Sequence, residues 1–120
     1  MQYMLLIYVD PETAPKPGSP EAQENHGAWM RVSEEMGPVT VSGAPLQGVD
    51  TATTVRTNGG GEPVLSDGPF AETKEFLGGY YIIDVPDLDT ATAWASKTPN
   101  QAYGSVEVRP VQDFPGLTPA

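Results

Sequence analysis

The sequence predicts a single α+β domain in which two helices cover one face of an antiparallel sheet. The predicted elements follow the order strand, helix, strand, hairpin, strand, helix, strand. Without the hairpin, this order is the ferredoxin-like split βαβ pattern. The two strands that this topology places at the sheet centre, 2–9 and 76–85, are apolar on both alternating faces. A length of 120 residues also fits one domain, 1–120.

The first half of the chain starts with the strand at 2–9 and continues with a helix at 20–36. Ser19 is the expected N-cap of this helix, Pro20 suits its first turn, and Gly37 with Pro38 ends it. A strand is expected around 39–46. The intervening segment 10–19 and the end of the chain at 113–120 are rich in proline and are expected to be loosely ordered.

The second half begins with a hairpin, because two strand-like runs, 51–57 and 62–66, flank an Asn-Gly-Gly-Gly turn. In the strand at 76–85, Gly78 and Gly79 indicate a bulge or a close approach of two backbones. A second helix at 88–97 has Asp87 as its expected cap. The last strand covers 105–111.

The two helices can cover only one face of such a sheet. The other face would expose tyrosine, leucine and isoleucine to water, which is typical of an interface. A second copy packed sheet against sheet would cover this face, so we expect a symmetric homodimer.

Composition excludes several classes of function. Sixteen acidic and six basic residues give a net charge of −10, which disfavours nucleic acid and anionic membranes as partners. The chain has no cysteine, which rules out disulfides and thiol catalysis and fits a cytoplasmic protein. The apolar run that ends before Asp10 has no preceding basic residues and is expected to be a strand, not a signal peptide or a membrane span.

One stretch, "DGPFAETKE" at 67–75, resembles the signature of the DGPF proteins, a branch of the YCII-related family. The likeness extends to His26 and Trp29, to "LGGYYIIDV" at 77–85 and to "VEVRP" at 106–110. It implies a ferredoxin-like fold that forms a dimeric α+β barrel, with a pocket around a histidine and an aspartate. Most members of the family have no established activity, and a few relatives act on small aromatic or lactone-like compounds without an organic cofactor. Genes of such proteins often lie near those of sigma factors, which hints at regulation.

His26 and Asp67 are the candidate catalytic residues. His26 is the sole histidine and shares a helix face with Trp29, and imidazole exchanges protons near neutral pH. The alternative is a partly buried histidine that bonds a backbone carbonyl. Asp67 would orient His26 or act as a base, or it would cap the helical turn that Pro69 begins.

Four further residues are candidate contacts for a substrate: Glu72, Lys74, Tyr81 and Arg109. Glu72, Lys74 and Glu75 lie on about one turn and cannot all face inward, so some are expected to be solvated charges. Arg109 alternates with two valines and would face the dimer cleft if the valines face the helices. Packing is the alternative role of Tyr81.

These residues favour a small-molecule-binding dimer that performs lyase- or isomerase-type acid–base chemistry with no cofactor. The alternatives are a non-catalytic regulatory module linked to sigma-factor systems and a cofactor-free monooxygenase-like protein. One histidine with scattered carboxylates lacks the spacing of known metal sites, so no metal is expected.

Overall fold

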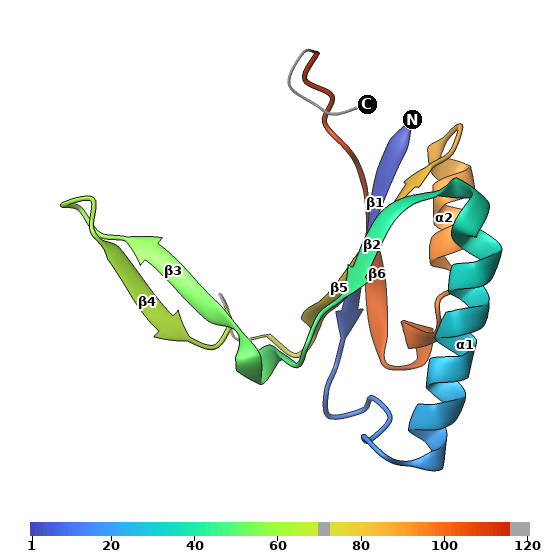
Figure 1. The fold of residues 1–120 in the computed structure, drawn as a ribbon, viewed down its shortest axis with the longest axis horizontal. Coiled ribbons are helices and arrows are strands. Elements are labelled where there is room, and N and C mark those ends of the chain that lie inside the picture. The colour runs from blue at the N-terminus through green and yellow to red at the C-terminus, as the bar shows by residue number, and fades with distance from the viewer. Residues whose placement is uncertain (70–72, 116–120) are drawn as a thin grey trace.

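The computed structural model describes residues 1–69 and 73–115 and has the predicted order of elements (Figure 1). The short 3₁₀ turns η1 (Gly37–Val39), η2 (Val49–Thr51) and η3 (Pro99–Ala102) lie between some of them. The longer elements are β1 (Gln2–Val9), α1 (Pro20–Met36), β2 (Thr40–Pro45), β3 (Thr53–Thr57), β4 (Pro63–Asp67), β5 (Phe76–Asp84), α2 (Leu88–Ala95) and β6 (Gly104–Pro110). The ferredoxin-like α+β prediction is thus confirmed.

The main sheet is antiparallel with strand order β2-β5-β1-β6. The strands predicted at the centre, β1 and β5, do lie there. Both helices cover one face of this sheet, and the β3–β4 hairpin forms a separate sheet that projects away from the helices (Figure 1).

Both helices begin at the predicted caps. The Ser19 hydroxyl accepts a hydrogen bond from the Ala22 amide at 3.1 Å, and the Asp87 carboxylate accepts one from the Thr90 amide at 2.8 Å. Helix α2 ends at Ala95, earlier than predicted, because the chain turns into η3. In the described part of the chain, neither helix is long and apolar enough to cross a bilayer.

The core lies between the helices and one face of the sheet. Leu5, Met36, Ile83 and Ala91 are all fully buried there. The last strand adds Val106 and Val108 to the same layer. Arg109 therefore lies on the opposite face, as its alternation with the valines predicted.

The opposite face is the second apolar surface of the sheet, which we call the open face. Its members follow from the register, which pairs Met4 with Ile82 and Leu6 with Tyr80 across β1 and β5. All four are only half-buried in the single chain. The second copy expected to cover the open face stays a prediction.

Candidate functional site

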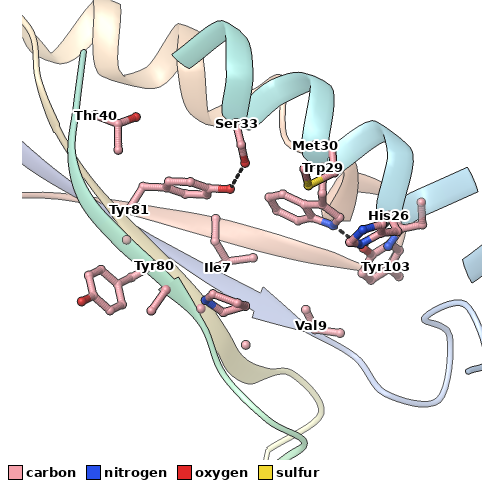
Figure 2. Close-up of a pocket in the computed structure, with 16 residues that line it drawn as sticks. Ile7, Val9, His26, Trp29, Met30, Ser33, Thr40, Tyr80, Tyr81 and Tyr103 are labelled. Atoms are coloured by element: carbon pink, nitrogen blue, oxygen red, sulfur yellow. Dashed lines mark hydrogen bonds between the residues drawn. The ribbon is translucent and has the colours of Figure 1, made fainter. Parts of the chain in front are cut away.

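A cavity of about 550 Å³ lies between α1 and the strands β1, β2 and β5 (Figure 2). Cavities of this size accommodate small organic ligands. The lining is largely apolar and aromatic, with hydroxyl groups and one imidazole among it. It comprises Ile7, Val9, Asn25, His26, Trp29, Met30, Ser33, Thr40, Gly43, Ala44, Pro45, Gly78, Gly79, Tyr80, Tyr81 and Tyr103.

Glycines keep part of this cavity open. Gly43 and Gly79 lie where β2 and β5 approach each other, and a Cβ at Gly79 would sit 2.9 Å from the Ala44 carbonyl oxygen. Gly78 lies at the register shift between β1 and β5, which confirms the predicted bulge. Three glycines at one end of the sheet leave space that side chains would otherwise fill.

An aromatic pair forms one wall. The rings of Trp29 and Tyr81 are stacked, with centroids 6.4 Å apart and planes 19° from parallel. The hydroxyls of Tyr81 and Ser33 share a hydrogen bond of 2.7 Å. The indole Nε1 of Trp29 donates to the Tyr103 hydroxyl at 3.2 Å, and that hydroxyl donates to Asn25 Oδ1 at 3.0 Å. Hydrogen bonds therefore hold both rings in place (Figure 2).

His26 lies at the rim of the cavity and is exposed. It is placed one turn before Met30 on the face of α1 that borders the cavity, and Met30 is 59% exposed. Among the described residues, the His26 ring has no hydrogen-bond partner. The alternative of a partly buried histidine bonded to a carbonyl is therefore wrong, and the ring is accessible to a ligand.

Asp67 does not line the cavity in this chain. It ends β4 in the projecting hairpin, where its side chain is exposed. The next residue, Gly68, has φ of 98° and donates its amide to the Ala52 carbonyl, which closes the base of the hairpin. The alternative role of Asp67 as a helix cap involves residues 70–72, which lie outside the described residues.

The other candidate residues are distributed around the fold. Tyr81 lines the cavity, whereas Arg109 lies on the open face. The Lys74 ammonium is 3.8 Å from the buried carboxylate of Asp10, and Glu72 lies outside the described residues. Glu75 accepts a hydrogen bond from the Ser105 hydroxyl at 2.6 Å.

Two polar members of the site escaped the sequence interpretation. Asn25 and Tyr103 are far apart in sequence and meet only because η3 packs beside α1. Tyr103 lies in a loop, where no periodic pattern marks the direction of a side chain. Within the described ranges, no group of three or more histidine, aspartate or glutamate side chains is arranged to hold a metal ion.

Comparison with known proteins places this site in a family context. The family model described as YCII-related domain matches residues 1–115. An uncharacterized protein of Rhizobium meliloti (strain 1021) is 43% identical over 89 residues, which cover 72% of this chain and 68% of that protein. The structure of 5-chloro-2-hydroxyhydroquinone dehydrochlorinase (TftG) from Burkholderia phenoliruptrix AC1100, in complex with 2,5-dihydroxybenzoquinone, is similar with a TM-score of 0.53. That alignment covers 96% of this chain and 97% of TftG at 15% identity, a likeness that concerns the fold.

Proposed function

Because this chain belongs to the YCII-related family, we propose that its cavity binds a small hydroxylated ring compound and catalyses a cofactor-free elimination or isomerisation on it. The observation that carries this proposal is the cavity itself. It combines a stacked aromatic wall with hydroxyl groups and the chain's one histidine at the rim. A planar ring has an apolar body and polar edges, and such a lining complements both.

The size of the cavity and the nature of its walls support a ring compound. A volume of about 550 Å³ exceeds what a single aromatic ring needs, which leaves room for substituents. Hydroxyls of Ser33, Tyr81 and Tyr103 offer both donors and acceptors to the substituents of such a ring. The similarity to TftG, whose structure holds a dihydroxybenzoquinone, agrees with this choice.

In the proposed reaction, His26 exchanges the proton. In the keto tautomer of the ring, the carbon that bears the leaving group is tetrahedral. The His26 imidazole takes a proton from a ring hydroxyl or an adjacent C–H of this tautomer, and the electron pair released forms the new double bond and expels the leaving group. The products are the unsaturated ring compound, the leaving group and protonated His26, so no oxidant is required. One hydroxyl of the Tyr81–Ser33 pair donates to the other, and the remaining hydroxyl hydrogen of the pair would stabilise negative charge that develops on a ring oxygen.

The other predicted contacts keep more limited proposed roles. Asp67 would orient the His26 ring, a role that it cannot fill from its place in the hairpin of the same chain. Lys74 and Arg109 would attract an anionic substrate or intermediate, and Glu72 stays a candidate contact. We further propose a homodimer that acts in the cytoplasm.

A second candidate function is ligand binding without catalysis, in a regulatory module. The observation that favours it is the absence of any carboxylate from the described lining of the cavity. Binding requires only the shape of His26, whereas catalysis requires its proton. The two candidates therefore differ in how activity depends on pH.

Binding is tested by tryptophan fluorescence with 2,5-dihydroxybenzoquinone as the probe. The chain has two tryptophans, and Trp94 is not among the cavity residues, so Trp94→Phe leaves Trp29 as the reporter. We expect saturable quenching in this variant that exceeds the inner-filter loss of a free tryptophan standard. The matched Trp29→Phe variant, which keeps Trp94, serves as the control. Quenching that is equal in both variants, or that does not saturate, would contradict the proposed ligand class.

Catalysis is tested with a chlorinated hydroxyhydroquinone by measuring chloride release. We expect a bell-shaped pH dependence that His26→Gln abolishes while probe binding persists. Binding without turnover at any pH would favour the regulatory module. Oxygen consumption is followed in parallel with an electron-rich phenol, because it would reveal the monooxygenase-like alternative.

A further inference from the structure

We propose that the β3–β4 hairpin of one chain docks on a second copy of this chain and brings its Asp67 to the mouth of that copy's cavity, beside His26. This inference rests on the proposed function and deepens it, because it makes the site a joint product of two chains. Neither chain would then have a complete site by itself.

The first observation is that the hairpin is uncovered. Val55 and Leu65 lie directly opposite each other on β3 and β4, and they are 59% and 67% exposed. A two-stranded hairpin is marginally stable in water when no other surface packs against it. The hairpin projects from the body on the side away from both helices (Figure 1). It therefore requires a partner surface to cover its apolar pair.

The second observation is that Asp67 shares a face with this pair. Alternate residues of a strand point to the same side, so Asp67 and Leu65 lie on one face of β4, while Ser66 lies on the other. Any surface that covers Val55 and Leu65 would thus also receive the carboxylate of Asp67. The exposed Met30 beside His26 offers an apolar contact at the rim of the cavity.

The third observation identifies a second copy as the occupant. The hairpin projects to the side of the main sheet that carries the open face (Figure 1). A single second copy could therefore cover both the open face and the apolar pair of the hairpin. Glu107 and Arg109 are exposed neighbours on the open face of β6. A two-fold axis pairs unlike residues of the two copies, so Glu107 of each chain can meet Arg109 of the other. This self-complementary charge favours an identical partner for a chain of net charge −10.

The reach of the hairpin agrees with this arrangement. Facing sheets pack about 10 Å apart, and a helix is about 10 Å across. The helix layer of a partner would therefore lie within about 20–25 Å of this sheet. The molecule extends 48 and 45 Å along its two long axes although its third dimension is only 18 Å. The hairpin accounts for much of that length, as Figure 1 makes visible.

The fourth observation is that the cavity lacks the group that Asp67 would supply. The described lining contains no carboxylate, and His26 has no hydrogen-bond partner among the described residues. A carboxylate that accepts a hydrogen bond from one imidazole nitrogen fixes the orientation of the ring and selects the tautomer. Asp67 from the second copy would therefore act as a positioning residue for His26.

The test uses the single histidine as a reporter and needs no ligand. An isotope-labelled chain that carries Asp67→Asn is refolded either alone or with an excess of unlabelled wild-type chain, and co-purification through a tag confirms mixed dimers. We expect the His26 ring signals to move in the variant alone and to return to the wild-type position in the mixture. Signals that do not move, or that move and are not restored by the partner, would overturn the proposal.

A cross-linking experiment checks the same contact. The chain has no cysteine, so His26→Cys and Asp67→Cys chains can be mixed and treated with a short bis-maleimide. We expect this mixture to form a covalent dimer several-fold faster than a matched mixture of His26→Cys and Ser66→Cys chains. The side chain of residue 66 lies on the other face of the hairpin. Equal rates would contradict the predicted face. If the His26 signals are restored but the probe does not bind, the proposed function is wrong and the contribution of Asp67 stands. If the probe binds but the signals are not restored, the contribution of Asp67 is wrong and the proposed function stands.

Discussion

Trp29 of α1 and Tyr81 of β5 lie as a nearly parallel pair, with ring centroids 6.4 Å apart and planes at 19°. Each ring is anchored at its polar atom, Tyr81 by Ser33 and Trp29 by Tyr103. The wall of the cavity is therefore fixed before any ligand arrives. A preorganised wall reduces the entropy lost on binding.

Removal of the Tyr81 hydroxyl is expected to lower the free energy of unfolding by about 1 kcal/mol, the usual net value of such a hydrogen bond. Urea unfolding of Tyr81→Phe, Ser33→Ala and the double variant measures this. The coupling energy between the two changes should be about 0.5–1.5 kcal/mol. Strictly additive effects would show that the 2.7 Å contact contributes nothing to stability.

A side chain at Gly79 is expected to destabilise the sheet. The new Cβ of Gly79→Ala would lie 2.9 Å from the Ala44 carbonyl oxygen and 3.2 Å from Pro45 Cα, both backbone atoms. Overpacking of this kind costs about 1–3 kcal/mol, which thermal or urea unfolding detects. Gly59→Ala is the matched control, because nothing lies within 4 Å of a Cβ there. Equal stability of the two variants would mean that the sheet adjusts freely at Gly79.

Asn100 is expected to be a major contributor to stability. Its side chain is fully buried, and its Nδ2 donates to the carbonyls of Tyr8 and Ser105, both at 2.9 Å. Asn100→Ala leaves two carbonyls without this donor and should cost about 2 kcal/mol or more. The exposed Gln112→Ala change, measured in the same unfolding experiment, should have almost no effect. A loss below about 0.5 kcal/mol at Asn100 would indicate that water replaces the amide.

The stability of α2 is expected to fall in acid through Asp87. The Thr90 hydroxyl and backbone N–H, which donate to this carboxylate, lower the pKa of Asp87. A lowered folded-state pKa means that the stabilisation is complete above the ordinary aspartate value of about 4 and is lost as the pH falls through the lower folded value. Asp87→Asn, which still caps the helix, should reduce this acid dependence. Urea midpoints between pH 2 and 6 that fall in parallel for both proteins would rule out this role.

Lys74 is expected to contribute little to stability. Its side chain is 79% exposed and its ammonium is 3.8 Å from Asp10, so solvent screens the pair. Lys74→Gln should change the free energy of unfolding by less than about 1 kcal/mol. Any effect of this change on probe affinity would then report on the ligand directly. A large loss of stability would instead assign Lys74 to the fold.

The fold was predictable because its signals are local and repeated. Two-sided apolar runs at 2–9 and 76–85 indicated central strands, and the caps at Ser19 and Asp87 defined the starts of both helices. Strand alternation likewise placed Arg109 on the face away from the helices.

The site was predictable only in part. His26 and Tyr81 lie on regular elements, whose periodicity gives the direction of a side chain, and both line the cavity. Tyr103 follows no periodic pattern, so its bond to Asn25 depends on tertiary packing. Asp67 belongs to a hairpin whose orientation relative to the sheet is not encoded in either strand. For that reason, local sequence could not decide whether Asp67 lies near His26.

The two outer strands of the sheet are poor templates for further strands. On β2, the register is interrupted between Thr40 and Ser42, and Pro45 has no amide hydrogen to donate. On β6, the charged Glu107 and Arg109 precede Pro110 at the end of the strand. Growth of the sheet into fibres by edge-to-edge pairing is thus discouraged at both margins.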